Sequence, residues 1–287
     1  ACRGSSLYSI LLLVIYINFI KGVFKMKCEL FNDNFQNYKH YGIPCKAQLV
    51  ITDIPYNVAS NAYGSNPSWY INGDNKNGES KLAGKSFFRT DNNFNIAEYF
   101  HFCSKLLKKE PKERNQAPAM IVFCSWQQIP LVQHYGTKHG FKNSYPIWFV
   151  KKSSTQALKA NMKIVGATEC AMVLYRDKLP KFRNLWQQEE TGKKMILNWF
   201  EWEQDDRKKY PKCHPTQKPV RLIKKLIQTF TDPGDVVIDP CAGSGSTLRA
   251  AYELGRPSYG FEVDKKFFKD AKEKMLNFDN TKEMELF

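Results

Sequence analysis

Short apolar runs alternate with amphipathic segments along most of this chain. Residues 47–53, 119–125, 147–151 and 169–176 are rich in branched, aliphatic and aromatic side chains, and polar or turn-forming residues separate them. Such runs predict buried β-strands. Because helical patterns lie between them, the order of elements is typical of an α/β protein with one sheet.

The last third of the chain gives the clearest pattern. Apolar residues recur at helical spacing over 220–230, which predicts an amphipathic helix. A strand at 235–239, a glycine-containing loop, a helix that starts near Ser246 and ends before Gly255, and a strand at 258–264 follow. Together these segments predict a β-α-β unit.

Residues 1–25 do not fit this alternation. The apolar run from Leu7 to Ile20 is shorter than the roughly 20 residues that a membrane-spanning helix needs, and lysines follow it instead of a cleavage site with small residues. We expect residues 1–25 to lie outside the fold, as translated upstream or vector-derived sequence. A membrane anchor and an additional ordered helix are the alternatives.

Two internal segments also lack periodicity. Residues 57–93 are full of Gly, Asn and Ser and predict a long mobile loop. Residues 178–212 are polar, rich in lysine and arginine, and contain tryptophans. We therefore expect an insertion between the parts of the chain that form the sheet.

Charge narrows the class of partner. The chain has 287 residues with 43 Lys and Arg against 28 Asp and Glu, a formal net charge of +15. Residues 101–225 hold 25 of the basic and 10 of the acidic side chains. This concentration favours a polyanionic partner, with nucleic acid first, over the alternative of a solvated surface. The eight cysteines show neither a C-x-x-C pair nor a zinc-ligand pattern, so we expect no metal and a reducing, cytoplasmic compartment.

The segment D-P-C-A-G-S-G-S-T at 239–247 lies between a predicted strand and a predicted helix. Glycines allow a tight turn and a close approach of backbone to a ligand, and a helix N-terminus offers free N–H groups. Glu262, seventeen residues after Gly245, ends the next strand, where a carboxylate can bind ribose hydroxyls. Leu248 replaces the last glycine of a dinucleotide motif. The pattern predicts a nucleoside-containing cofactor, with a purely structural turn as the alternative.

Two further motifs are weak when taken singly. Asp53, Ile54, Pro55 and Tyr56 follow a buried strand, at the end where open α/β sheets bind ligands. The segment C-H-P-T-Q-K-P at 213–219 leads into the amphipathic helix. A turn and an ordinary helix start would explain them about equally well.

The combination is more specific than its parts. D-I-P-Y, H-P-T-Q-K-P-V, D-P-C-A-G-S-G-S-T and Y-G-F-E-V-D, in that order, resemble the amino-directed (N6-adenine or N4-cytosine) DNA methyltransferases of the permuted class, in which the catalytic motif precedes the cofactor motif. The resemblance runs from about Met26 to Asn277. It implies a Rossmann-like, S-adenosylmethionine-dependent methyltransferase sheet with helices on both faces, and a methyltransferase domain over 26–287.

The resemblance also implies a reaction and a set of site residues. S-adenosylmethionine would donate a methyl group to the exocyclic N6 of an adenine flipped out of duplex DNA. Cofactor binding would fall to seven residues: Asp33, Thr216, Lys218, Asp239, Gly243, Gly245 and Glu262.

The catalytic residues implied are Asp53, Ile54, Pro55 and Tyr56. The Asp53 carboxylate and the Ile54 carbonyl would accept the two amino N–H groups, and Tyr56 would stack on the base. The family's usual form is D-P-P-Y, with Ile54 here in place of the first proline. Because the functional group at that position is the backbone carbonyl, we expect activity to be retained.

The resemblance implies a basic target-recognition insertion at about 178–212, because this class has target recognition between the catalytic half and the cofactor half. We expect DNA contacts at Lys181, Arg183, Arg207, Lys208 and Lys209. Asp53 favours adenine, because the family's cytosine enzymes more often carry serine there. N4-cytosine methylation and an inactive DNA-binding relative are the alternatives, with a glutamine-directed protein methyltransferase more distant. Duplex DNA is the expected partner and the nucleoid the expected location, without membrane attachment. A homodimer, a cognate restriction endonuclease and an orphan methylase are left open.

Overall fold

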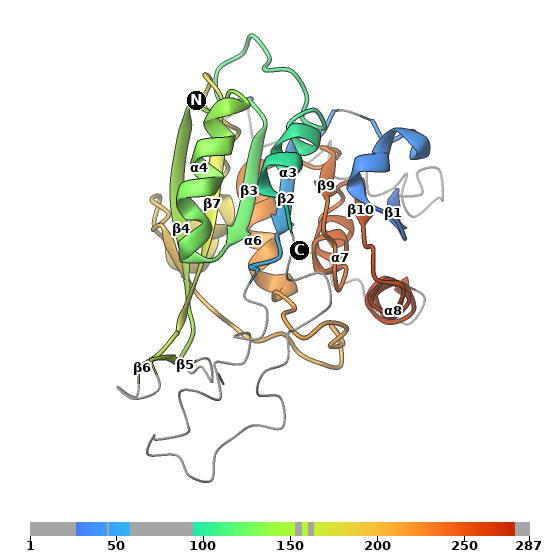
Figure 1. The fold of residues 1–287 in the computed structure, drawn as a ribbon. Helices are drawn as coiled ribbons and strands as arrows, with labels where there is room; N and C mark the ends of the chain where they lie inside the picture. The colour runs from blue at the N-terminus through green and yellow to red at the C-terminus, as the bar shows by residue number, and fades with distance from the viewer. Residues whose placement is uncertain (1–26, 45, 58–93, 153–156, 160–163, 279–287) are drawn as a thin grey trace, which may run out of the picture.

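The computed structural model describes residues 27–278 apart from 45, 58–93, 153–156 and 160–163 (Figure 1). The expected leader at 1–25 and nearly all of the expected loop at 57–93 therefore lie outside the described residues. Within the described part of the chain, no helix is long and apolar enough to cross a membrane.

Eight strands form one mixed sheet in the order β1-β10-β9-β2-β3-β7-β4-β8. The first five are mutually parallel, β7 runs antiparallel to both β3 and β4, and β8 is parallel to β4. A small hairpin of β5 (Ala157–Lys159) and β6 (Ile164–Val165) stands apart. The strands of the sheet are β1 (Cys28–Phe31), β2 (Leu49–Asp53), β3 (Ala119–Cys124), β4 (Asn143–Val150), β7 (Thr168–Tyr175), β8 (Trp199–Glu201), β9 (Val237–Asp239) and β10 (Ser258–Phe261).

The strands and helices predicted from the apolar pattern are confirmed, with shifts at their ends. Burial explains why the strand signal is strong, since every residue of β3 is buried. The run at 147–151 corresponds to the second half of a longer strand, β4. The residues of its first half are partly buried or exposed, so this half has no continuous apolar run in the sequence. The segment 178–212 contributes β8 to the edge of the sheet, so part of the expected insertion is integral to the fold.

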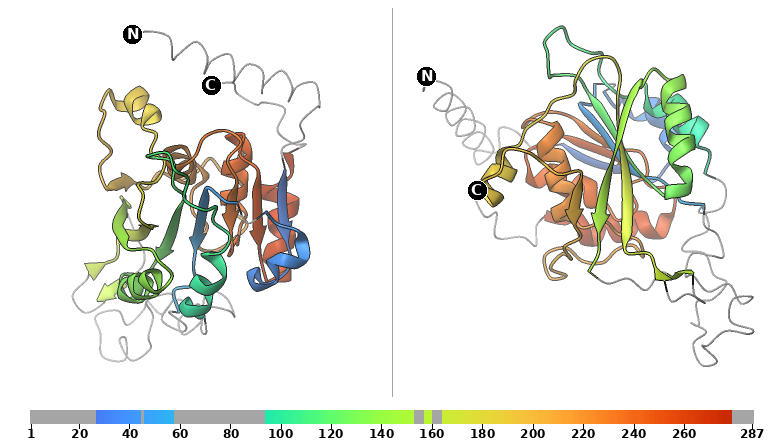
Figure 2. Two further views of the ribbon diagram at one scale, coloured as in Figure 1. Left: turned by 90° about the horizontal axis from the view of Figure 1, so that it is seen from above. Right: turned by 90° about the vertical axis from the view of Figure 1, so that its left-hand side faces the viewer.

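Helices cover both faces of the sheet (Figures 1 and 2). Adjacent residues of β2 point to opposite faces, so Val50 packs with one cluster while Leu49 and Ile51 pack with the other. The first cluster includes η1 (Phe35–Tyr41), α3 (Ile96–Cys103) and α4 (Ile129–Lys138); the second includes α6 (Val220–Phe230) and α7 (Ser246–Glu253). The remaining helices are η3 (Trp126–Gln128), α5 (Leu185–Thr191), α8 (Lys265–Asp270) and η5 (Ala271–Met275).

The topology gathers particular strand ends at one edge of the sheet. The carboxyl ends of the five parallel strands meet there, as do those of β4 and β8. Because β7 is antiparallel, it brings its amino end to the same edge. Open α/β sheets bind ligands at this edge, and the polar strand ends of this chain converge on it.

Candidate active site

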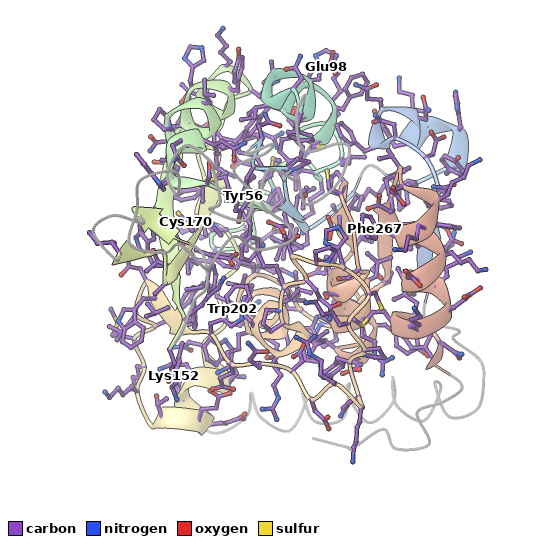
Figure 3. The ribbon with its side chains drawn as sticks, turned by 60° about the horizontal axis from the view of Figure 1, so that its bottom comes forward. Tyr56, Glu98, Lys152, Cys170, Trp202 and Phe267 are labelled. Carbon is purple, nitrogen blue, oxygen red and sulfur yellow. The ribbon has the colours of Figure 1, made fainter. Side chains whose placement is uncertain are left out.

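A cavity of about 1510 Å³ opens at this edge. Its walls come from the end of β2, the loop between β9 and α7, the residues after β10, the start of β7 and the segment before α6. Figure 3 labels six residues of this wall, among them Tyr56, Trp202 and Phe267, which belong to parts of the chain far apart in sequence. Both predicted motif groups, the one around Asp53 and the one around Asp239, therefore line one cavity.

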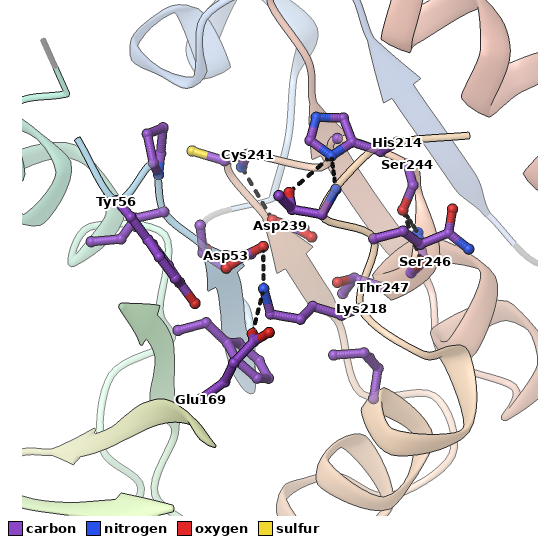
Figure 4. Close-up of a pocket in the computed structure, with 18 of the residues that line it drawn as sticks. Asp53, Tyr56, Glu169, His214, Lys218, Asp239, Cys241, Ser244, Ser246 and Thr247 are labelled. Atoms are coloured by element: carbon purple, nitrogen blue, oxygen red, sulfur yellow. Dashed lines mark hydrogen bonds and ion pairs between the residues drawn. The ribbon is translucent and has the colours of Figure 1, made fainter. Parts of the chain in front are cut away.

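Asp53 ends β2 and faces a lysine from the segment before α6. Its Oδ2 accepts a hydrogen bond of 2.6 Å from Lys218 Nζ, whereas Oδ1 is buried and accepts none from the described residues (Figure 4). Burial raises the pKa of Asp53, and the Lys218 ammonium opposes this. The site thus holds a carboxylate oxygen that is available to a donor on a ligand.

Lys218 lies at the centre of this end of the cavity. Its side chain is only 6% exposed, and Nζ is also 3.1 Å from Glu169 Oε2 and 5.4 Å from the centre of the Tyr56 ring. Burial disfavours the charged amine, but the two carboxylates outweigh it and raise the pKa of Lys218. The structure therefore places Lys218 beside Asp53. It lines the same cavity as the Asp239 loop, and its role at the methionine end of a cofactor stays a prediction.

Glu169 and Lys151 are site residues that sequence reasoning missed. Glu169 lies at the start of β7, and Lys151 follows β4 and forms an ion pair with the other oxygen of Glu169. Burial raises the pKa of Glu169, but the two lysines more than compensate, so it is lowered overall. In the sequence, Lys151 is a single charge at the end of one apolar run and Glu169 a single charge at the start of another. The sequence does not show that these two positions meet in space.

The loop after Asp53 is held from two sides. The Ile54 N–H donates to the Phe123 carbonyl at 3.2 Å, and Gln128 Nε2 donates to the Pro55 carbonyl at 2.9 Å. Ile54 is 1% exposed and packs in the core. Packing and these hydrogen bonds hold Ile54 at the position where the family's usual sequence has its first proline.

Tyr56 stands beside Asp53 with its hydroxyl buried and without a hydrogen-bond partner among the described residues. Burial raises its pKa well above that of an ordinary tyrosine, and the carboxylates of Asp53 and Glu169 add to this effect. The phenol therefore stays neutral, and its ring presents an aromatic wall to the cavity.

The second group of site residues forms a continuous loop. Gly243 (φ +49°) and Gly245 (φ +76°) adopt left-handed backbone that other residues adopt only at a cost, and Gly245 directly precedes α7. Asp239, which ends β9, accepts a hydrogen bond from Cys241 N at 3.1 Å, and burial raises its pKa to about 7. Glu262 accepts from Gly243 N at 2.9 Å and from Asp264 N at 2.7 Å. The predicted cofactor loop is thus assembled around two carboxylates.

Thr216 and His214 line the cavity between the two groups. Thr216 N and Oγ1 lie 3.3 and 3.1 Å from His214 Nδ1. The His214 ring packs edge-on against Phe267 with centroids 4.2 Å apart, and burial lowers its pKa to about 4. The imidazole is therefore neutral at physiological pH.

Asp33 lies outside the cavity wall, although its neighbours Asn34 and Phe35 line it. Its carboxylate accepts hydrogen bonds of 2.7 Å from Asn34 N and 2.8 Å from both Asn37 Nδ2 and Tyr41 Oη. These local hydrogen bonds lower the pKa of Asp33. These hydrogen bonds shape the turn into η1, and a role of Asp33 in cofactor binding stays a prediction.

The five basic residues expected on DNA divide into two sets. Lys181 is 9% exposed and forms ion pairs with Asp232 and Asp235, and Arg183 Nε lies 2.8 Å from Asp232 Oδ1. Arg207 and Lys208 are exposed, and Lys209, which lies over the Tyr210 ring, is partly exposed. Lys181 and Arg183 are thus paired with aspartates, whereas Arg207 and Lys208 present positive charge to the outside, and Arg207 also lines the cavity.

The architecture, a mixed sheet with helices on both faces and a strand-end cavity, is that of a Rossmann-like methyltransferase. A sequence profile described as DNA methylase, covering N6 and N4 methyltransferases, matches residues 47–273. The chain belongs to this DNA methylase family.

Individual relatives match in shorter segments. YubD of Escherichia coli (strain K12) is 28% identical over 160 residues, 54% of this chain and 61% of its own length. DNA adenine methyltransferase YhdJ of the same organism is 45% identical over 56 residues, 20% of this chain and 19% of its own. The chain thus spans less than two thirds of the length of these relatives.

Solved structures share the fold over most of the chain. The complex of M1.HpyAVI with SAM has a TM-score of 0.59 at 22% identity, covering 87% of this chain and 98% of the other. The cytosine-N4-specific PvuII DNA methyltransferase has a TM-score of 0.56 at 14% identity, covering 89% and 88%. The expected fold class is confirmed.

Proposed function

We propose that this protein transfers the methyl group of S-adenosylmethionine to the exocyclic N6 of an adenine flipped out of duplex DNA. The observation that carries the proposal is Asp53. Its carboxylate lies at the end of β2, with Oδ1 buried and accepting no hydrogen bond from the described residues, in the same cavity as the glycine loop after β9.

The chemistry explains why a carboxylate is needed. The lone pair of an exocyclic amine is delocalised into the ring, so the nitrogen is a poor nucleophile until its geometry becomes tetrahedral. Asp53 and the carbonyl of Ile54 would accept its two N–H groups and aim the lone pair at the methyl group. These hydrogen bonds strengthen as positive charge develops on nitrogen, which stabilises the transition state more than the ground state.

The neighbouring residues support this role. Lys218 favours the ionised form of Asp53, which is the form that accepts hydrogen bonds. The Tyr56 ring offers a stacking surface for a base, and base stacking offsets the few kcal/mol lost when a base leaves the duplex. Direct transfer between a well-positioned amine and methyl group needs no covalent enzyme intermediate.

The cofactor loop suits a nucleoside with a cationic tail. Glu262 is a partly buried carboxylate that could accept from ribose hydroxyls, and Asp239 is a buried carboxyl that positive charge would help to ionise. Gly243 lines the cavity and has no side chain, so a ligand could approach the loop backbone closely there. S-adenosylmethionine, when bound, supplies the electrophilic methyl group, and the M1.HpyAVI relative was solved with SAM.

Adenine is favoured over cytosine by the acid at position 53 and by the similarity to an adenine methyltransferase, YhdJ. Cytosine N4 is the second candidate, because the cytosine-N4-specific PvuII enzyme shares the fold. We place the chain in the permuted class, since the catalytic motif at Asp53 precedes the cofactor loop at Asp239. We propose 26–287 as the methyltransferase domain, Arg207, Lys208 and Lys209 as the DNA-facing set, and the nucleoid as the location.

The test is transfer of labelled methyl from S-adenosylmethionine to duplex DNA, followed by nuclease digestion and separation of the nucleosides. We expect N6-methyladenine, and modification-sensitive sequencing of DNA from expressing cells should give its sequence context. N4-methylcytosine alone would select the second candidate. A folded protein that binds DNA and cofactor but yields no methylated base would contradict both.

A further inference from the structure

The base-binding end of the cavity contains more charge than the reaction requires. Lys218 Nζ lies 2.6 Å from Asp53 Oδ2 and 3.1 Å from Glu169 Oε2, and Lys151 forms an ion pair with Glu169 Oε1. The four groups alternate in sign across β2, the segment before α6, β7 and the end of β4, and Figure 4 shows three of them, Asp53, Lys218 and Glu169. One ammonium would be enough to neutralise Asp53, so the second carboxylate needs an explanation.

Stability does not explain Glu169. Its side chain is 16% exposed and that of Lys218 is 6%, and removing such groups from water costs several kcal/mol per ion. Glu169 also lies near Asp53, and a neighbouring like charge opposes the ionisation of Asp53. A purely structural contact at this position could be made by apolar residues at lower cost.

The geometry indicates what Glu169 does. The Lys218 ammonium lies within ion-pair distance of both Asp53 Oδ2 and Glu169 Oε2, and Lys151 pairs with the other oxygen of Glu169. As a result, Lys218 occupies only one oxygen of Asp53, and the other accepts no hydrogen bond from the described residues. Without the second carboxylate, the lysine would be free to move fully onto Asp53 and compete with an incoming amine.

We propose that Glu169 is a positioning residue that divides the Lys218 ammonium between two carboxylates, so that Lys218 occupies one oxygen of Asp53 and leaves the other for the amino group of the base. This inference deepens the proposed function and rests on it for the identity of the base. Lys151 supports Glu169 through its ion pair.

The test compares two variants of the full chain with opposite expected effects. Glu169→Gln keeps the size of the side chain and removes the like charge, so the pKa of Asp53 should fall. Lys218→Met removes the ammonium, so the pKa of Asp53 should rise. Carbon-13 NMR of carboxyl-labelled aspartates, with the Asp53 signal assigned by its loss in Asp53→Asn, measures both shifts without methyl transfer.

Methyl-transfer kinetics provide the second measurement. In Glu169→Gln, the acid limb of the turnover profile should move to lower pH, and turnover at neutral pH should fall about tenfold, less than for loss of a direct transition-state contact. Glu169→Asp should restore part of the turnover at neutral pH and move the acid limb part of the way back. Glu203→Gln is the matched control, because Glu203 is a carboxylate that also lines the cavity but is 54% exposed. This variant should change neither the turnover at neutral pH nor the position of the acid limb.

The outcomes separate the two proposals. An Asp53 pKa that is unchanged or raised in Glu169→Gln would overturn the positioning role, whatever the activity. A loss of turnover without a pH shift, and without recovery in Glu169→Asp, would show that Glu169 only packs. If the unmodified protein methylates no DNA, the proposed function fails, while the NMR shifts still decide whether Glu169 controls Asp53 through Lys218.

Discussion

The two ends of the cavity are built in different ways. At the end around Asp53, the proposed base-binding end, side chains from β2, β4, β7 and the segment before α6 meet in one network of ion pairs. At the end around Asp239, the proposed cofactor-binding end, a single loop runs from Asp239 to Thr247, and Glu262 accepts hydrogen bonds from nearby backbone N–H groups. The first end depends on long-range tertiary contacts, the second mainly on local backbone conformation.

The electrostatics of the two ends differ as well. Lys218 opposes the effect of burial on Asp53, so that this carboxyl can ionise in a nearly closed site. Asp239 has backbone and hydroxyl hydrogen bonds instead of an ammonium, and burial raises its pKa to about 7. A cationic ligand would complete the charge balance at the cofactor end, whereas the base end is balanced before any ligand arrives.

The largest effect is expected from Asp53→Ala. Turnover should fall by about a hundredfold or more, because a contact that strengthens in the transition state is lost. The dissociation constant of S-adenosylmethionine, measured by calorimetry, should stay close to that of the unmodified protein, because Asp53 belongs to the other end. Turnover near the original value would remove Asp53 from the mechanism, and a large loss of cofactor affinity would mean that the two ends are not independent.

Glu262→Ala should produce the reverse pattern. S-adenosylmethionine affinity should weaken by roughly 1–3 kcal/mol, because ribose hydroxyls lose their acceptor. At saturating cofactor, turnover should change much less. Since Glu262 also accepts from Gly243 N, thermal unfolding should be measured alongside to show that the loop stays folded. An unchanged dissociation constant would point to another carboxylate, with Asp264 the nearest candidate.

Asp239 gives the cofactor end a pH dependence of its own. Its pKa is about 7 in the folded protein against 3.8 for an ordinary aspartate, so the protonated form is favoured by folding. Its contribution to the free energy of unfolding is present in full below about pH 4 and is lost as pH rises through 7. Relative to the unmodified protein, Asp239→Asn should therefore become steadily more stable between pH 4 and 7. Denaturant titrations across this range would show it, and a constant difference would contradict the raised pKa.

The smallest effect concerns salt. DNA affinity should fall with salt at a log–log slope of about −0.9 per phosphate contacted, and neutralising Arg207, Lys208 and Lys209 together should make that slope shallower. The triple variant should keep the cofactor affinity of the unmodified protein, because these side chains lie outside the predicted cofactor loop. Filter binding over a salt series measures the slope.

The matched control for the salt series is Lys181→Gln, which removes a lysine buried between Asp232 and Asp235. This variant should keep the original slope and lose thermal stability, because breaking a buried ion pair leaves charge uncompensated. If the triple variant keeps its slope and Lys181→Gln changes it, the DNA-facing surface lies elsewhere.

Much of the fold could be predicted from the sequence alone, because its signals are local. The apolar run that became β3, the helical spacing that became α6 and the glycine loop before α7 each reflect burial or backbone conformation within a few residues. Asp53 could be singled out only through the order of its motif with those at 213–219 and 239–247, because a carboxylate at the end of a buried strand is ambiguous by itself.

Tertiary structure decided the rest. The sequence does not reveal that β7 pairs antiparallel with β3, and this direction alone brings Glu169 to the cavity. The partners of charged side chains were equally hidden: Lys181 is held by Asp232 and Asp235, while Lys218 is held by Asp53. Backbone propensity is fixed by near neighbours, but strand direction and ion pairing are fixed by residues tens to hundreds of positions away.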